Sequence, residues 1–426
     1  MQQQPASDAR PAQEARHDEL REGRSPWDAS GRPLRRSPER DLHCDVLIVG
    51  AGITGAMLAE HLTGPGKDSG KDVLVIDRER TGFGSTLAST AMLQWEIDRS
   101  LGELTALYGF EPAAQIYRKS FQAVGALKQH VTSLGLKCCL LPRRSLYLAA
   151  GTGDGAEALQ EEQRLRERAG LPTRYLDHRA LLQEYGIGRE AALESLGSAE
   201  ADPVCMAHQL LETAMQRGAR LYEGEAIAYE TSRAGVAVQL RDGPAIEAKK
   251  VVLATGYAMP DCVQTELATP SASWALATRP QPAKGPWPND ALIWEDATPY
   301  AYLRTTADNR IIIGGEDEPG LIDPGARQAL TAAKVERLQD KLRSLFPESD
   351  PTADFAWSGA FSETRDGLPL IGPVPGQPGL FAAYGYGGNG ITFSFLAARM
   401  LARQMAGRHE PWDEQVALDR PLPHLA

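Results

Sequence analysis

Apolar and polar positions follow two different periods along this chain, and the change between them predicts its first elements. Asp45–Val49 is a short, continuous apolar run with β-branched residues, which is typical of a central strand in a parallel sheet. After a glycine-rich turn, apolar residues recur at helical spacing from Ala56 to Leu62. A second β-rich run, Val73–Glu79, follows another glycine-containing turn. The pattern therefore predicts a strand, a helix and a second parallel strand.

Three glycines stand between the first strand and the helix at the spacing G-x-G-x-x-G: Gly50, Gly52 and Gly55. The first permits a tight turn, the second lets the backbone approach a pyrophosphate, and the third lets the helix pack closely on the strand. The helix N-terminus favours the phosphates because its N–H groups are free. The second strand ends at Asp77, 22 residues after Gly55, where a carboxylate would accept hydrogen bonds from ribose hydroxyls. The unit predicts a dinucleotide site.

A group of hydroxyl residues and glycines follows the second strand, at Gly84, Ser85, Thr86, Ser89 and Thr90. The pattern predicts that this group opens a long helix, whose donor-rich N-terminus would meet more of the same ligand. Nicotinamide-binding domains usually continue with another βα unit at this point. The sequence therefore favours a flavin dinucleotide.

A second glycine loop lies late in the chain, between Gly385 and Gly390, directly before the apolar helix predicted at Ile391–Met405. Glycines let backbone N–H groups approach a flat ring closely. A helix N-terminus fixed beside that ring would stabilise negative charge on it. The alternative interpretation is a plain glycine turn before a core helix.

Five motifs occur in an order that resembles a known family. They are the G-x-G-x-x-G unit with its acid, GSTLASTA, VVLATGY (Val251–Tyr257), DGLPLIGP (Asp366–Pro373) and GYGGNGITFS (Gly385–Ser394). In this order they resemble the FAD-dependent amine and amino-acid oxidoreductases of the D-amino-acid oxidase superfamily, which includes glycine oxidase, sarcosine oxidase and the D-amino-acid dehydrogenases. The resemblance is strongest at residues 44–98, 197–257 and 355–405.

The resemblance implies FAD as the cofactor. We expect it to be bound non-covalently, because no cysteine lies beyond Cys262 and no histidine lies between His61 and His130. The residues that the resemblance assigns to FAD are Gly50, Gly52, Ile53, Thr54, Gly55, Asp77, Arg78, Ser85, Thr86, Ser89, Thr90, Ala226, Thr255, Gly256, Gly385, Gly387, Gly388, Asn389, Gly390, Ile391 and Thr392.

The expected fold is α/β, with a Rossmann-like FAD-binding domain that is discontinuous in sequence and an α+β substrate domain built on an antiparallel sheet. The FAD-binding domain would comprise residues 43–98, 197–260 and 351–410, the substrate domain residues 99–196 and 261–350, and a tail residues 411–426. Residues 1–42 are polar and rich in Arg and Pro, so we expect a disordered or surface arm. Trp27 is its only large apolar anchor. We therefore expect deletion of residues 1–38 to change catalysis little.

The candidates for the substrate pocket are aromatic and basic. Tyr300, Tyr302 and Arg304 alternate along a predicted strand and so share one face. Trp95 follows the hydroxyl-rich group that should contact the flavin. In this superfamily the flavin accepts the hydride, and protein residues mainly orient the substrate.

This chain lacks an arginine that many relatives that oxidise amino acids carry at one position of a motif. Those relatives carry W-x-G-x-R shortly before D-G-L-P, and the arginine binds the substrate carboxylate. Here Trp357 and Gly359 are present, but Phe361 stands in place of the arginine. We expect either a substrate without a free α-carboxylate, or a clamp supplied by Arg304 or Arg279.

The sequence thus predicts an FAD-dependent enzyme that oxidises a C–N bond of a small amine or of an N-substituted or D-amino acid. The electron acceptor would be dioxygen or another carrier. Two alternatives remain open at this point. One is a dehydrogenase of a hydroxy acid or polyol phosphate on the same fold, and the other is a flavoprotein interaction subunit without independent activity.

The composition of the chain limits the kinds of binding partner that we expect. The 426 residues carry a formal net charge of −11, which argues against non-specific nucleic-acid binding. No apolar run approaches the length of a membrane span. The five cysteines form no C-x-x-C pair, so we expect reduced thiols and a cytoplasmic protein acting on a small molecule. The acids Glu316, Asp317 and Glu318 are expected to form a solvated turn, and no metal site is predicted.

Overall fold

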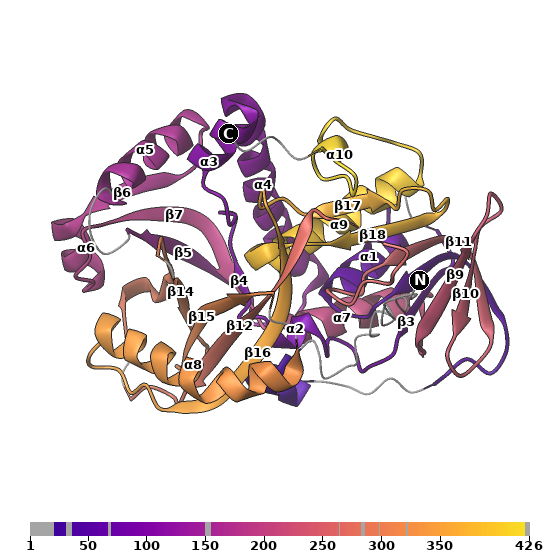
Figure 1. Cartoon of the computed structure of the whole chain (residues 1–426), viewed down its shortest axis with the longest axis horizontal. Helices are drawn as coiled ribbons and strands as arrows, with labels where there is room; N and C mark the ends of the chain where they lie inside the picture. The colour runs from indigo at the N-terminus through magenta and orange to yellow at the C-terminus, as the bar shows by residue number, and fades with distance from the viewer. Residues whose placement is uncertain are drawn as a thin grey trace, which may run out of the picture.

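Two sheets divide the chain into two lobes (Figure 1). The computed structural model describes residues 21–30, 36–66, 70–149, 155–263, 265–282, 286–297, 299–320 and 323–421. The smaller sheet lies on the right of the figure with helices α1, α7 and α9, and the larger sheet lies on the left with α5, α6 and α8. Residues 1–20, on which part of the expected arm falls, lie outside the described residues.

The smaller sheet has a parallel core. Its strands are β2 (Leu42–Val49), β3 (Val73–Asp77), β8 (Arg220–Glu223), β9 (Ala226–Thr231), β10 (Val236–Leu240), β11 (Ala245–Leu253), β17 (Leu370–Pro373) and β18 (Leu380–Tyr384). The strands β18, β11, β2, β3 and β8 run parallel in that spatial order. The remaining strands pair antiparallel: β17 on β18, β10 on β11, and β9 on β10. This is the dinucleotide-binding arrangement that the sequence predicts.

Three helices cover one face of the parallel strands: α1 (Ile53–Thr63), α7 (Pro203–Gln216) and α9 (Gly390–Met405). α1 lies between the other two, which explains why its apolar residues are not confined to one face. α7 begins at Pro203. Asp202 caps this helix, because its side chain accepts a hydrogen bond from the Cys205 N–H at 2.8 Å. Because α1 packs against α9, the N-termini of these two helices lie at neighbouring positions although they are far apart in sequence.

The larger sheet is mostly antiparallel, as predicted. Its strands, in spatial order, are β1 (Arg21–Arg24), β16 (Ala353–Thr364), β12 (Ala268–Thr278), β15 (Ile311–Pro319), β14 (Ala301–Thr305), β13 (Leu292–Glu295), β5 (Leu141–Leu148), β7 (Ala191–Glu200) and β4 (Met92–Leu93), with β6 (Thr173–Asp177) also on β7. β13 and β5 pair parallel.

The remaining helices connect or cover this sheet. They are α2 (Ser85–Ala88), α3 (Leu101–Tyr108), α4 (Phe110–Leu134), α5 (Gly155–Arg168), α6 (His178–Tyr185), α8 (Pro324–Leu345) and α10 (Trp412–Gln415), with 3₁₀ turns η2 (Pro26–Ser30), η3 (Pro288–Asp290) and η4 (Gly387–Asn389). α8 packs on β12, β15 and β16. None of the helices within the described ranges combines the length and the apolar character that a membrane crossing requires.

The domain boundaries differ from those expected at two strands. β16 falls within residues 351–410, which were expected to belong to the FAD-binding domain, but it pairs with β12 and β1 in the larger sheet. β7 runs through the expected boundary at residue 196 and stays in the larger sheet up to Glu200. The sequence analysis did not predict either segment as a strand, and local patterning carries no information about which sheet a strand joins.

The structure corrects two local expectations. The predicted long helix after Gly84 is a single turn, α2, because the chain leaves it at Ser89 to form β4. The acids Glu316, Asp317 and Glu318 are not a solvated turn but the end of β15. Lys334 from α8 bonds the Glu318 carboxylate at 2.5 Å and the Glu316 carbonyl at 2.7 Å. A basic helix packed against this strand end therefore neutralises charges that looked solvated in sequence.

The C-terminal tail is part of the fold. The Ile371 N–H of β17 donates to the Val416 carbonyl at 2.7 Å. Arg420 forms a two-point ion pair with the buried Asp366, at 2.7 and 2.9 Å, and the Tyr108 hydroxyl donates to the same carboxylate at 2.7 Å. Burial would raise the pKa of Asp366, but these partners hold it below its ordinary value. The pair therefore links the tail, α3 and the D-G-L-P turn.

Replacement of Arg420 by alanine should lower the free energy of unfolding by about 3–5 kcal/mol, because the Asp366 carboxylate would stay buried without its partner. Chemical denaturation of the purified protein measures the change. Arg365→Ala is the control, since Arg365 is next to Asp366 in sequence but exposed, and it should change stability by less than about 0.5 kcal/mol. Equal stabilities for the two variants would show that the ion pair contributes little.

Candidate active site

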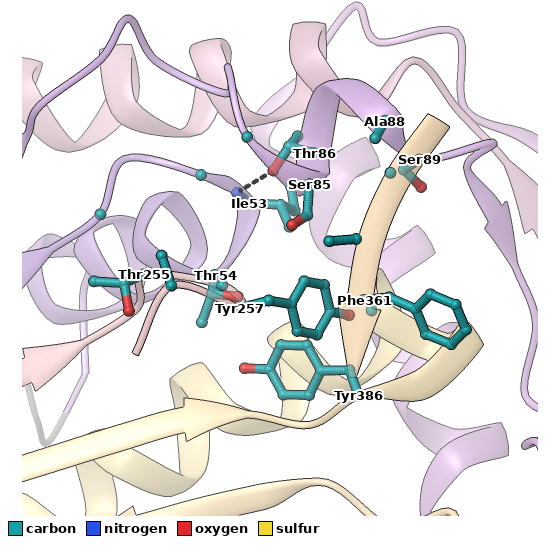
Figure 2. A pocket seen from close by; sticks show the side chains of 18 of the residues that line it. Ile53, Thr54, Ser85, Thr86, Ala88, Ser89, Thr255, Tyr257, Phe361 and Tyr386 are labelled. Carbon is teal, nitrogen blue, oxygen red and sulfur yellow. Dashed lines mark hydrogen bonds between the residues drawn. The ribbon is translucent and has the colours of Figure 1, made fainter. Parts of the chain in front are cut away.

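One large cavity lies between the two sheets and collects the glycine and hydroxyl motifs (Figure 2). Its volume is about 650 Å³. The N-termini of α1 and α9, the ends of β3 and β11, and the α2 turn form one part of its wall. β12, β14 and β16 of the larger sheet form the other part. The cavity therefore extends from the dinucleotide-binding lobe to the antiparallel sheet.

The first glycine loop fixes α1 against the parallel sheet. Gly50 has φ +111° and Gly55 lies so close to the Gly50 carbonyl that a Cβ there would overlap it. Gly52 is different, because a Cβ on it would meet one neighbouring heavy atom among the described residues, Thr86 Oγ1 at 3.2 Å. Thr86 also accepts the Ile53 N–H at 3.0 Å. Gly52 thus leaves open space on the cavity side of the helix N-terminus.

Asp77 stands at the end of β3 and lines the cavity. Its carboxylate accepts the Ala51 N–H at 2.6 Å and the Glu79 N–H at 2.9 Å. Burial raises the pKa of Asp77 to about 6, and the two N–H donors partly oppose that rise. The carboxylate is therefore held in place by the same loop that a pyrophosphate would contact.

The second glycine loop joins α9 to α1. The Thr54 and Ser394 hydroxyls bond each other at 2.7 Å across the two helices. From the same end of α9, Asn389 Nδ2 donates to the Glu96 carbonyl at 2.7 Å, and Thr392 Oγ1 donates to the Gln94 carbonyl at 2.9 Å. The chain between β4 and α3 is therefore tied to the α9 N-terminus through its carbonyls.

Asp98 is the acidic group next to this loop, and its carboxylate accepts the Gly388 N–H at 2.9 Å. The carboxylate faces the cavity. The Asp98 side chain is exposed to the open cavity. The surrounding protein nevertheless raises the pKa of Asp98 to about 6; the nearby acids Glu363 and Asp317 add to the rise, and Gly388 and Arg99 oppose it. A carboxylate with this pKa changes its charge within the pH range in which enzyme assays are ordinarily made.

Most residues that the resemblance assigned to FAD line this one cavity, although they come from distant parts of the sequence. They are Gly50, Gly52, Ile53, Thr54, Asp77, Arg78, Ser85, Thr86, Ser89, Thr90, Ala226, Thr255, Gly256, Gly387, Gly388, Asn389, Gly390 and Ile391. Gly55, Gly385 and Thr392 lie behind the wall. Of the substrate candidates, Tyr302 lines the cavity together with Tyr300, whose ring centroid is 5.8 Å away.

Trp95 and Arg304 do not line the cavity, so their expected place in the substrate pocket is wrong in this structure. Arg304 is 3% exposed and donates to the carbonyls of Thr90, Ala91 and Ala201 at 3.0–3.1 Å. Alternation places it on the same strand face as Tyr302, but that face continues beyond the cavity into the core. Its guanidinium therefore holds the wall from behind.

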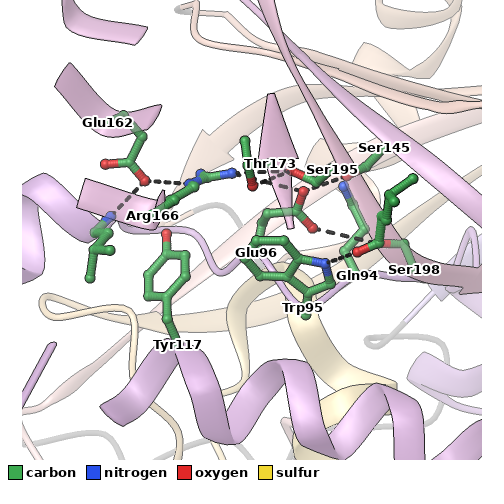
Figure 3. Close-up of polar contacts among 12 residues, drawn as sticks. Gln94, Trp95, Glu96, Tyr117, Ser145, Glu162, Arg166, Thr173, Ser195 and Ser198 are labelled. Carbon is green, nitrogen blue, oxygen red and sulfur yellow. Dashed lines mark hydrogen bonds and ion pairs between the residues drawn. The ribbon is translucent and has the colours of Figure 1, made fainter. Parts of the chain in front are cut away.

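Trp95 belongs to a buried polar network behind Gln94 and Glu96 (Figure 3). Its indole is fully buried and donates to the Leu196 carbonyl at 2.8 Å. The Arg166 guanidinium lies 5.5 Å from the Trp95 ring centroid. Arg166 donates to Glu162 at 2.7 Å and pairs with Glu96 at 3.9 Å.

Glu162 also accepts the first N–H groups of α3, from Leu101 and Gly102, at 2.9 Å each. Glu96 is further bonded by the Ser145 hydroxyl. A charged network thus fixes the chain segment that forms one side of the cavity.

The sequence did not identify several cavity residues. Asp98, Tyr257, Trp294 and Tyr386 all line the cavity, but none of them was assigned to FAD or to catalysis. Figure 2 shows Tyr257, Phe361 and Tyr386 gathered beside β16. Tyr257 and Tyr386 directly adjoin the glycine motifs, which is a usable signal. Asp98 and Trp294 carry no such signal, because only tertiary packing brings them to the wall.

The residues present fit a flavin dinucleotide. Two helix N-termini with nearby glycines meet at the cavity, which suits an elongated ligand that is anionic at one end. Several lining polar atoms, among them Ser85 Oγ, Gln94 Nε2 and Trp294 Nε1, are buried with no hydrogen-bond partner among the described residues. Buried polar atoms are seldom left unpaired, so a ligand that supplies partners is expected there.

The variant Gly52→Val should fold but retain little FAD, with affinity lowered by at least about a hundredfold, because its side chain would occupy the space beside the α1 N-terminus where a pyrophosphate binds. The ratio of bound FAD to protein, measured from the visible absorbance of the purified protein, tests this. Gly125→Ala is the control, since a Cβ on that helical glycine meets nothing within 4 Å. Wild-type FAD content in soluble Gly52→Val would refute the placement of the pyrophosphate.

Comparison with characterised proteins agrees with the geometry. The chain is 26% identical over 378 residues to gamma-glutamylputrescine oxidoreductase of Escherichia coli (strain K12), covering 87% of this chain and 85% of that protein. It is also 26% identical over 384 residues to glycine oxidase of Geobacillus kaustophilus (strain HTA426), covering 87% of this chain and 94% of that protein.

Solved structures show the same fold. The crystal structure of glycine oxidase from Geobacillus kaustophilus aligns with a TM-score of 0.74 at 22% identity, over 89% of this chain and 99% of that one. The L-alpha-glycerophosphate oxidase of Mycoplasma pneumoniae with FAD bound aligns with a TM-score of 0.70 at 15% identity, over 87% of this chain and 97% of that one.

The family model described as FAD dependent oxidoreductase matches residues 45–404, which include every glycine motif discussed above and both sheets apart from β1 and the start of β2. The chain therefore belongs to this family of FAD-dependent oxidoreductases, and its cofactor is FAD.

Proposed function

We propose that the protein oxidises a C–N bond of a small, positively charged amine that lacks a free α-carboxylate. When bound, FAD supplies the oxidant: once the ammonium has lost one proton to solvent, the flavin would take a hydride from the carbon next to the substrate nitrogen. The resulting imine is hydrolysed by water to a carbonyl compound and an amine. The names of two relatives, gamma-glutamylputrescine oxidoreductase and glycine oxidase, support the choice of a nitrogen-containing substrate.

The distribution of charge along the cavity carries the proposal. Among the described residues that line it, Arg78 is the one basic side chain, and it pairs with Glu225 at 3.4 Å near the Asp77 end. The opposite end, at β14 and β16, is lined by aromatic residues and by Asp98. Aromatic faces and a carboxylate bind cations and repel anions. This end therefore suits an ammonium group.

A substrate carboxylate finds no cation at that end among the residues that the structure describes. Phe361 lines the cavity on the same face of β16 as Trp357 and Gly359, where an arginine would have projected inward. Arg304 is committed to backbone carbonyls, and Arg279 is exposed and does not line the cavity. Both alternative sources of a carboxylate clamp are thus absent from the cavity wall. A carboxylate buried there would lack a partner, which is costly.

The same argument weighs against oxidation of a hydroxy acid or a polyol phosphate. Each of these substrates would bring negative charge next to Asp98 without a basic partner among the described lining residues. The fold alone does not separate the two reactions, because a glycerophosphate oxidase shares it. The negative charge at the substrate end of the cavity favours the amine over a hydroxy acid or a polyol phosphate. An interaction subunit without activity is a weaker alternative, because the cavity extends beyond the glycine loops to the substrate face of β14 and β16.

Paired steady-state kinetics on an amino acid and its decarboxylated amine test the proposal. We expect wild-type kcat/KM to be at least about tenfold higher for the amine, because the carboxylate has no partner at Phe361. Phe361→Arg should reverse or abolish this preference by supplying a bidentate donor. Phe361→Leu is the matched control, since it removes the ring without adding charge. A strong wild-type preference for the amino acid would contradict the proposal.

The pH dependence of the amine reaction should report Asp98. As pH falls through about 6, protonation removes the negative charge of Asp98, so kcat/KM for a cationic amine should fall. Asp98→Asn keeps an acceptor for the Gly388 N–H but lacks the charge. It should lower the plateau by about tenfold and lose this acidic limb. An unchanged limb in the variant would assign the titration to another group.

A further inference from the structure

Four consecutive backbone carbonyls of the cavity wall are each held by a side chain from a distant part of the chain. Trp357 Nε1 donates to the Ala88 carbonyl at 2.8 Å, and Trp27 Nε1 donates to the Ser89 carbonyl at 2.7 Å. Arg304 Nη1 donates to the carbonyls of Thr90 and Ala91 at 3.0 Å each. Residues 88, 89 and 90 line the cavity. Their carbonyls are therefore engaged by the protein behind the wall.

The backbone of this wall is strained. Ala91 is buried and has φ +56°, a left-handed conformation that an alanine rarely adopts. Such a conformation persists only where the surroundings fix it. The Ser89 hydroxyl accepts the Ala91 N–H at 3.0 Å, and Arg304 holds the Ala91 carbonyl. The side-chain donors behind the wall therefore hold Ala91 in this conformation.

One of these donors belongs to the arm that precedes the family match at residues 45–404. Trp27 is 7% exposed and packs in a cluster with residues from α2, α7 and the larger sheet. The Arg304 Cζ atom lies 5.6 Å from the centroid of its ring. Trp27 therefore contacts both the wall and the arginine that holds the rest of the wall.

Other described residues of the arm, Arg21–Arg24 and Asp28, contact β16 and the start of the same loop. β1 pairs with β16 from Arg21 opposite Gly359 to Arg24 opposite Ala356. Arg21 Nε donates to the Phe83 carbonyl at 2.9 Å, and its guanidinium lies 4.0 Å from the Phe83 ring centroid. Asp28 pairs with Arg80 at 2.6 Å. The arm thus contacts the cavity loop at Arg80, Phe83 and Ser89.

We propose that residues 21–30 are a structural part of the FAD site and that Trp27 is a positioning residue, which holds the Ser89 carbonyl so that the wall is preformed when FAD binds. This inference rests on FAD binding and not on the identity of the substrate. It replaces the sequence-based expectation that the arm has little effect. Trp27 acts through Ser89, and no direct contact between Trp27 and FAD is required.

The experiment is FAD titration of deflavinated protein carrying Trp27→Phe, which keeps an aromatic ring but lacks the N–H donor. The dissociation constant of FAD should rise about tenfold, as expected for the loss of one buried hydrogen bond at the site. The visible circular dichroism of bound FAD should also change, because the wall beside the flavin shifts. Unfolding of each apoprotein is measured in parallel.

The matched control is Trp287→Phe. Trp287 is 3% exposed, and its Nε1 donates to the Ala291 carbonyl at 2.8 Å, but this pair lies in the larger lobe away from the cavity. It should lose similar stability and leave the FAD dissociation constant and spectrum unchanged. If both variants weaken FAD binding equally, or if neither does, the positioning role of Trp27 is refuted.

A second variant keeps the test decisive if Trp27→Phe does not fold. Arg21→Met combined with Asp28→Asn removes two of the arm's contacts to residues 80–83 without touching its buried ring. FAD release from this protein should be about three to ten times faster than from the wild type. An unchanged release rate would show that the arm only covers the surface of the loop.

Discussion

The approach of α1 to the parallel sheet is the constraint on which the site depends. Gly50 turns the chain with a positive φ, and Gly55 lets the helix lie so close that a side chain there would overlap the Gly50 carbonyl. This places the α1 N-terminus at the edge of the cavity. The Thr54–Ser394 hydrogen bond then places the α9 N-terminus beside it. Two helices separated by more than 300 residues thereby present their free N–H groups to one ligand.

The cavity wall formed by residues 88–96 is held by side-chain hydrogen bonds and not by regular secondary structure. The chain from residue 88 to residue 96 is mostly irregular, so its carbonyls cannot all be satisfied by a sheet or a helix. Side chains satisfy them instead: two indoles and an arginine at residues 88–91, and Asn389 and Thr392 at residues 94 and 96. The buried network of Arg166 with Glu162 and Glu96 supports the same segment (Figure 3). An irregular wall is rigid here because its acceptors are individually bonded.

Charge divides the cavity into two functional ends. The end near Asp77 suits the adenosine half of FAD, with N–H donors and a carboxylate at the end of β3. The end near Asp98 combines one carboxylate with aromatic faces, which suits a cation. Phe361 matters because an arginine at that position would reverse this preference. Under the proposed function, substrate selection would be separate from cofactor binding and would depend on a few side chains at this end of the cavity.

The sequence by itself determined the features that depend on local backbone requirements. Gly50, Gly52, Gly55 and Asp77 identified the dinucleotide unit, because spacing along one strand–turn–helix fixes their relative positions. The apolar pattern also predicted a helix at Ile391–Met405, and α9 spans Gly390–Met405. The family motifs then indicated FAD.

Only the tertiary structure decided the features that depend on which segments meet. Arg304 and Trp95 looked like pocket residues, but strand alternation gives a face and not what packs against it. β16 looked like part of the FAD-binding domain, yet it joins the larger sheet, because strand pairing is non-local. Trp27 looked like a lone anchor in a polar arm, but its indole donates to the Ser89 carbonyl at the cavity wall, a partner that lies 62 residues away in sequence.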